Sequence, residues 1–506
     1  MPPRAPDTAF FGHPTGLSTL FFTEMWERFS YYGMRALLIL FMTAPLAAGG
    51  LAMPVDQAAG IYGSYVAMVY MMTIAGGWVA DKLLGFRKAV FWGGVLIMLG
   101  HISLAMPRIE TFYLGLLLVV LGTGLLKGNI SAIVGQLYGD QDVRRDAGYS
   151  LYYMGINLGA FFGPLITGWL AQSEGFRRML QGWGISPEAS WHWGFGAAAV
   201  GMAFGLTQYL FGGKRLPERS LYAAGGTDPV AVARSRRTLT MAIGSVAAVV
   251  LVLLGLQAAG VLRITTSGIA TGLDWLLLLI TVGFFAWLFL AGKWTSQERK
   301  RLVVILVLFL GASVFWAAFE QAGSTLNLFA ERNTANTMFG LAYPASWLQS
   351  VNPAFIIIFA PVFGWLWVKL GPRNPSSPAK FTLGLFLLAS GFAVMILAAM
   401  AASGGARVSP MWLIVSYLLQ TFGELCLSPV GLSAMSKLAP ERVAGLMFGV
   451  WFLASSVGNK IAGRVAGLYE SFDLPTIFAA NTLFVLVFAV VLALLIRPIA
   501  RMLARQ

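Results

Sequence analysis

Long apolar stretches separated by short polar connections dominate the chain. A membrane-spanning helix needs about 20 mostly apolar residues to cross a hydrocarbon core about 30 Å thick. The pattern predicts fourteen such helices, at residues 17–44, 57–81, 88–107, 111–138, 147–171, 191–213, 239–261, 273–292, 301–329, 345–370, 380–402, 411–437, 443–469 and 475–496. The first stretch contains four charges, so it is not the short uncharged core of a cleavable signal peptide.

The predicted helices fall into a group of six, a pair and a second group of six. Residues 214–238 form the longest and most basic polar stretch, which predicts a linker between two halves. We therefore expect an N-terminal bundle at 1–213, a linker with two additional helices at 214–300, and a C-terminal bundle at 301–506. The apolar runs of the additional pair contain almost no ionisable residues, which predicts lipid-facing helices.

Composition supports an all-α integral membrane protein. Hydrophobic residues make up 58% of the chain and charged residues 11%, with a mean hydropathy of +0.73. Soluble domains carry roughly 25% charged residues, so a soluble fold is excluded. The single Cys426 excludes a disulfide framework, and the three histidines lie too far apart in sequence to suggest a metal site. The sequence contains no catalytic motif, which argues against an enzyme and a cofactor.

The net charge of +14 could suggest a nucleic-acid partner, but the positions of the charges favour another explanation. With the N-terminus placed in the cytoplasm, the inner connections hold about four times as many Lys and Arg residues as the outer ones. Such an excess is typical of cytoplasmic loops. It predicts an even number of spans with both termini in the cytoplasm, in the inner membrane of a cell, and no nucleic-acid partner.

The first predicted helix carries a stripe of ionisable residues. Its members share one face, at spacings of i, i+3, i+4, i+7 and i+11: Glu24, Glu27, Arg28, Tyr31 and Arg35. An ion at the bilayer centre costs about 2.5–3.5 kcal/mol even on a lenient insertion scale. The stripe is therefore predicted to face the protein interior.

Other buried ions can be ranked by depth, at about 1.5 Å of rise per residue. Arg35 and Glu320 are both predicted near 27 Å from the inner end of their helices. Lys127 is predicted near 16 Å, level with Glu24, Glu27 and Arg28, and Glu424 slightly higher, near 20 Å. One acid–base set thus lies outward and one inward, as expected for two gates around a midplane site.

Uncharged polar residues also occur inside the predicted spans. The prominent ones are Tyr70, Asn157, Asn327, Asn352, Trp451 and Ser455. A hydrogen bond between helices is the commoner role for each of them, and a contact with a ligand is the alternative. Lys460 and Arg464 lie toward the outer end of their helix, where snorkelling toward the interface is the predicted explanation.

Several motifs resemble a known transporter family. Residues 77–88 resemble the connection between the second and third helices of the major facilitator superfamily. Residues 24–33, with Glu24-x-x-Glu27-Arg28-Phe29-x-Tyr31-Tyr32-Gly33, are similar to the first-helix signature of its proton-dependent oligopeptide transporter family. Residues 149–161, 315–321, 423–429 and 451–452 resemble further motifs of that family. The resemblance implies a major facilitator fold, with two six-helix bundles and two extra central helices.

The resemblance also implies roles for individual residues. A peptide pocket would be lined by Arg28, Tyr31, Tyr32, Arg35, Tyr70, Lys127 and Asn157 from the N-terminal half and by Asn352, Glu424, Trp451 and Ser455 from the C-terminal half. Proton coupling would involve Glu24, Glu27, Arg28, Lys127 and Glu320. Arg35 with Glu320 would close the outer gate, and Lys127 with Glu424 the inner gate. The stretch 61–65 lacks the proton-linked histidine of some relatives, so carboxylates must carry the proton.

The implied function is import of di- and tripeptides with protons, by alternating access, through a protein that works as a monomer in the lipid bilayer. Arginine and lysine can bind the peptide carboxylate, while Glu424 with asparagines can bind its ammonium. A major facilitator that carries another small anion or a drug, such as nitrate or a peptide-like drug, is the alternative. A passive channel is less consistent with buried acid–base sets.

Overall fold

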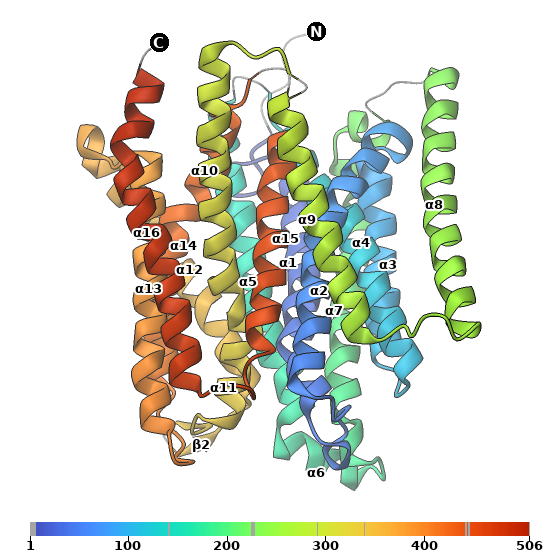
Figure 1. The fold of residues 1–506 in the computed structure, drawn as a ribbon. Coiled ribbons are helices and arrows are strands. Elements are labelled where there is room, and N and C mark those ends of the chain that lie inside the picture. Colours follow the sequence, from blue (N-terminus) through green and yellow to red (C-terminus); the bar gives the residue numbers. More distant parts are fainter. Residues whose placement is uncertain are drawn as a thin grey trace.

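The computed structural model describes residues 7–139, 142–223, 228–290, 292–338, 340–440, 443 and 446–504. Long helices run side by side, and both chain termini lie at the same end of the molecule (Figure 1). The short helix α6, Glu174–Gly182, lies at the opposite end (Figure 1). These are called the terminal end and the α6 end below.

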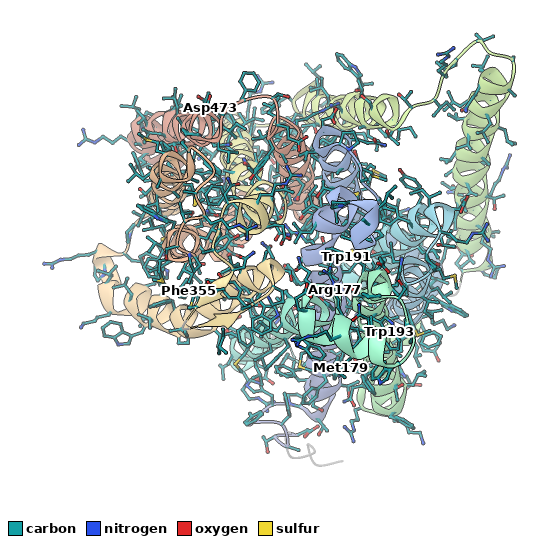
Figure 2. The ribbon with its side chains drawn as sticks, turned by 90° about the horizontal axis from the view of Figure 1, so that it is seen from below. Arg177, Met179, Trp191, Trp193, Phe355 and Asp473 are labelled. Atoms are coloured by element: carbon teal, nitrogen blue, oxygen red, sulfur yellow. The ribbon has the colours of Figure 1, made fainter. Side chains whose placement is uncertain are left out.

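The first seven α-helices form one group of packed helices. Besides α6 they are α1 Thr15–Thr43, α2 Val55–Val79, α3 Phe86–Leu104, α4 Ile109–Gln136, α5 Arg145–Gln172 and α7 Ser190–Gly212. The last seven, with the one small hairpin of the described residues, form a second group. They are α10 Ser296–Phe319, α11 Thr325–Arg332, α12 Val351–Leu370, α13 Ser377–Ala402, α14 Met411–Leu438, α15 Met447–Ala466 and α16 Leu474–Ala504, with strands β1 Thr337–Met338 and β2 Leu341–Ala342. Seen from the α6 end, the two groups lie beside each other, one with Phe355 and Asp473 and the other with Trp191 and Trp193 (Figure 2).

Short helical turns connect or extend these elements. They are η1 Leu46–Ala48, the π-helical η2 Ala80–Leu84, η3 Pro187–Ala189, η4 Gly213–Arg215, η5 Glu218–Leu221, η6 Glu320–Gly323, η7 Ala345–Ser350 and η8 Gly371–Arg373. The stretch predicted as one helix at 301–329 is therefore interrupted by η6, between α10 and α11. Glu320 lies at this break and not within a continuous helix.

Each predicted span corresponds to a helix of the structure, so the predicted all-α membrane fold is confirmed. Eleven described helical segments are long and apolar enough to cross a membrane. Helices α1, α3 and α15 account for the remaining predicted spans, and the charges of α1 explain its lower hydropathy. Small residues let the helices approach closely: a Cβ on Gly159 of α5 would lie 2.1 Å from the Met25 carbonyl oxygen of α1.

The inserted pair, α8 Pro229–Ala258 and α9 Thr266–Leu290, differs from the prediction in two ways. Helix α8 begins at Pro229, so the predicted polar linker 214–238 is helical over its last ten residues. The Asp228 side chain accepts a hydrogen bond from the Val230 amide, and arginine is a good helix former, so the helix extends beyond the apolar run. Helix α8 has no buried residue, as predicted for a lipid-facing helix (Figure 1). The second difference is that α9 packs against α2 and α15 and is not wholly lipid-facing.

Candidate functional site

An ion cluster lies within α1, nearer its terminal end. Arg28 Nε lies 2.8 Å from Glu24 Oε1 and 2.7 Å from Glu27 Oε2. All three side chains are at most 3% exposed. Glu24 Oε2 and Glu27 Oε1 are buried and have no hydrogen-bond donor among the described residues. One cation therefore serves two carboxylates, which leaves oxygens on which a proton can reside.

Lys127 of α4 has an aromatic neighbour. Its Nζ lies 3.8 Å from the centroid of the Tyr70 ring on α2, a cation–π contact. Among the described residues no ion pair joins Lys127 to Glu24, Glu27 or Glu424, although the sequence predicts it level with the first two. Depth follows from counting residues along a helix, but the lateral direction of a long side chain does not.

Arg35 connects the two groups of helices. Its Nη2 pairs with the Glu320 carboxylate at the start of η6, and its Nε donates to the Tyr62 hydroxyl of α2 over 2.6 Å. Arg35 and Glu320 are 8% and 3% exposed. The Tyr32 ring also lies against the guanidinium, with 5.9 Å between Arg35 Cζ and the ring centroid. Tyr31 is buried beside this cluster.

The C-terminal group contributes a carboxylate held by an amide. Asn352 Nδ2 of α12 donates to Glu424 Oε2 over 3.2 Å and to Thr421 Oγ1 over 2.9 Å, both on α14. Glu424 is 8% exposed. Because Asn352 fixes one oxygen, the carboxylate has a defined orientation and can accept from a bound ammonium. Thr421 was not predicted; it lies three residues before Glu424, so helical spacing could have indicated it.

The remaining predicted polar residues bind their own or neighbouring helices. Asn157 Nδ2 donates to the Tyr153 carbonyl and Ser455 Oγ to the Trp451 carbonyl, each within one helix. The Trp451 ring lies 6.3 Å from that of Trp316 on α10. The structure thus leaves the ligand role of these residues a prediction. Asn327 Nδ2 donates to the Ala36 carbonyl over 2.8 Å, the predicted commoner role of a hydrogen bond between helices.

The snorkelling explanation is wrong for Lys460, whose side chain is buried; the Arg464 side chain is 47% exposed. Lys460 Nζ lies 3.2 Å from Asp274 Oδ1 of α9 and donates to Ser64 Oγ of α2 over 2.6 Å. Arg464 pairs with the other oxygen of Asp274. These cations have a counter-ion from the inserted helix, which the sequence pattern did not place beside them.

Hydrogen bonds also cross between the two groups of helices, from the middle of the molecule to the α6 end. Besides those of Arg35, Asn327 and Lys460, the crossing donors are Ser350 Oγ to the Phe161 carbonyl, Trp347 Nε1 to the Leu165 carbonyl, Ser456 Oγ to the Ala67 carbonyl, Gln172 Nε2 to Glu331 and the Ser346 amide to Gln172 Oε1. In the described parts of the chain no three His, Cys, Asp or Glu side chains are grouped as a metal site would need.

Comparison with known proteins identifies what the chain is similar to. Residues 87–484 match the sequence model of the POT family. The chain is 43% identical to the peptide transporter YePEPT of Yersinia enterocolitica, over 97% of this chain and 96% of that protein. It is 37% identical to a di-/tripeptide transporter of Lactococcus lactis, over 98% of both chains.

Solved structures of POT transporters are similar to this chain as well. A crystal structure of a peptide transporter POT in complex with sulfate superposes with a TM-score of 0.88 at 40% identity, over 98% of this chain and 97% of that one. A POT family transporter in complex with 5-aminolevulinic acid has a TM-score of 0.87 at 33% identity, over 98% of both chains.

Proposed function

Because the chain belongs to the POT family, a family of transporters rather than enzymes, we propose that it imports di- and tripeptides together with protons by alternating access. The observation that carries this proposal is the contrast between two acid–base sets. Arg35 and Glu320 pair across the two groups of helices, while Lys127 and Glu424 remain apart.

The charges suit the two ends of a short peptide. Arg28, Arg35 and Lys127, from α1 and α4, offer cations to a carboxylate, and arginine can do so with two parallel hydrogen bonds. Glu424, held by Asn352, offers a carboxylate to an ammonium. Recognition of the two ends leaves the peptide side chains loosely specified, so we expect broad acceptance.

Proton coupling is assigned to the α1 cluster and Lys127. Protonation of Glu27 would remove one of the two negative charges that share Arg28. Arg28 would then be freer to bind a peptide carboxylate, and Lys127 could exchange its aromatic neighbour for an acid. This links proton binding to peptide binding without any cofactor.

Alternating access needs two bodies that rock about the site. We propose residues 1–213 and 301–506 as these bodies, in a monomer of the inner membrane with both termini in the cytoplasm. The α6 end then faces outward. We infer an inward-facing state, which is supported by the pairing of Arg35 with Glu320 at that end and by the separation of Lys127 from Glu424.

Uptake into liposomes tests the function. Purified protein in proteoliposomes should concentrate labelled dialanine when the outside is acidic, and a protonophore should abolish the accumulation. Protein-free liposomes are the control. Uptake of nitrate or a drug with no competition by dipeptides would favour the alternative transporter, and uptake independent of the proton gradient would overturn proton coupling.

A further inference from the structure

Helix α9, which belongs to neither group of helices, contacts the place where the two groups meet. There α2 and α15 touch through backbone atoms: a Cβ on Gly63 would lie 2.7 Å from Gly463 Cα, and one on Gly463 would lie 2.6 Å from Gly63 Cα. A Cβ on Gly60, one turn before Ser64, would lie 3.7 Å from the Ala270 side chain of α9. The inserted helix therefore lies over the contact between α2 and α15 around Gly63 and Gly463, which is called the seam below.

A buried cation crosses this seam. Lys460 of α15 is 6% exposed, and its Nζ donates to Ser64 Oγ of α2 over 2.6 Å. Ser64 Oγ donates in turn to the Gly60 carbonyl over 2.7 Å, so its lone pairs point toward the ammonium. A hydroxyl alone does not neutralise a buried ammonium, which is costly without a counter-ion.

Asp274 of α9 supplies that counter-ion. Its Oδ1 lies 3.2 Å from Lys460 Nζ, and its other oxygen pairs with Arg464, one turn further along α15. Arg464 Nη2 also donates to Thr271 Oγ1 of α9 over 3.0 Å. Asp274 thus pairs with two cations of α15. One of them, Lys460, also donates a hydrogen bond to Ser64 of α2.

We propose that Asp274 is a positioning residue that keeps Lys460 on Ser64 and so fastens the two halves at the α6 end. The inserted pair then acts on the transport cycle, since α9 stabilises the state that is closed outward. The seam lies at the level of the Arg35 gate, because Tyr62, which accepts from Arg35, is two residues from Ser64 on α2. The contact rests on the structure alone, and only its consequence for transport rests on the proposed function.

The test measures the opening of the α6 end without peptide. Spin labels are placed at Leu46 and Leu341, which are 71% and 74% exposed and belong to different halves, in a background with Cys426→Ala. Asp274→Asn should raise the ratio of the long to the short distance population by about tenfold, the usual effect of losing a hydrogen bond that depends on a charge. Asp274→Glu should restore the parent ratio in large part.

Ser64→Ala removes the acceptor and leaves every charge in place. It should give a similar shift, and the double variant Asp274→Asn with Ser64→Ala should give no more than either single change, because both act through Lys460. Asp473→Asn, at an exposed carboxylate at the α6 end, should give no shift and is the matched control.

An unchanged distance distribution in Asp274→Asn and Ser64→Ala would overturn the proposal, as would additive effects in the double variant. Should Asp274→Asn fail to fold, Ser64→Ala and Asp274→Glu still decide it. Since the distances are measured without substrate, a failure here is distinct from a failure of peptide transport.

Discussion

The two ends of the molecule differ in how the halves meet. At the α6 end charged and polar side chains cross between them, through Arg35 to Glu320 and Lys460 to Ser64. Toward the terminal end, Lys127 and Glu424 each find their partners within their own half, in Tyr70 and Asn352. Among the described residues, rocking the halves apart would therefore break ionic contacts at the α6 end, while Lys127 and Glu424 are available to form a contact at the other end.

Helix α1 contains both kinds of ionic contact, seven residues apart. Arg28 pairs with carboxylates of its own helix, so its contacts survive any movement of the halves. Arg35 pairs with the opposite half, so its contact must break when the α6 end opens. In the proposed mechanism these two arginines therefore have different roles, one in a fixed proton site and one in a moving gate, and the helix that presents the partner determines which role each has.

The largest effect is expected for changes to the α1 ion cluster (Glu24, Glu27 and Arg28) or to Lys127. Glu27→Gln should reduce proton-driven dipeptide uptake by about 100-fold or more, since a charge is lost from a fully buried set. Lys127→Ala should have a similar effect because it removes the cation that can exchange partners. Counterflow with equal peptide on both sides needs no gradient, so it should survive in Glu27→Gln.

Concentrative uptake at the parent rate in either variant would refute the coupling role of this cluster. Glu110→Gln is the control, because its carboxylate is 72% exposed and pairs only with exposed Arg108. An exposed pair contributes little, so uptake should be unaffected.

The second effect concerns the moving contact. Arg35→Ala or Glu320→Gln leaves one ion buried without its partner, which disfavours the state closed at the α6 end. The distance between labels at Leu46 and Leu341 should then shift so that the long population predominates.

Arg332 and Glu470 provide the matched control for that measurement. They form an exposed ion pair with 2.7 Å between Nη1 and Oε1, but both belong to the C-terminal half. Arg332→Gln should leave the distances unchanged. If Glu320→Gln also leaves them unchanged and transport is intact, Arg35 and Glu320 are not a gate.

The third effect tests whether Glu424, toward the terminal end, binds the peptide ammonium. Glu424→Ala should weaken binding of free dipeptides by about tenfold to 100-fold, the range of a hydrogen bond between charged groups. Peptides with a blocked amino end present no ammonium, so their affinity should change little. Equal losses for free and blocked peptides would show that Glu424 supports the fold and does not bind the ammonium.

The sequence predicts most of the fold, because apolar length determines where helices cross a membrane. It also predicts depth, since residues along a helix rise by a fixed distance: Arg35 and Glu320, placed at one level by counting, are in contact. What the pattern does not encode is which helix lies beside which. Asp274 was overlooked for this reason, as its partners Lys460 and Arg464 are almost 190 residues away in the chain.

The smallest expected effect comes from changes to Tyr70, and it shows whether the ring or the hydroxyl of this side chain matters beside Lys127. The ammonium lies 3.8 Å from the Tyr70 ring centroid, and such a contact contributes about 0.5–2 kcal/mol. Tyr70→Leu should therefore raise the KM for dipeptides about threefold, because the ring no longer holds Lys127 in the orientation in which it meets the peptide. Tyr70→Phe keeps the ring and should retain the parent KM. If Tyr70→Phe is impaired as strongly as Tyr70→Leu, the hydroxyl contacts the peptide directly, and the terminal end contains a substrate ligand in place of a resting position for Lys127.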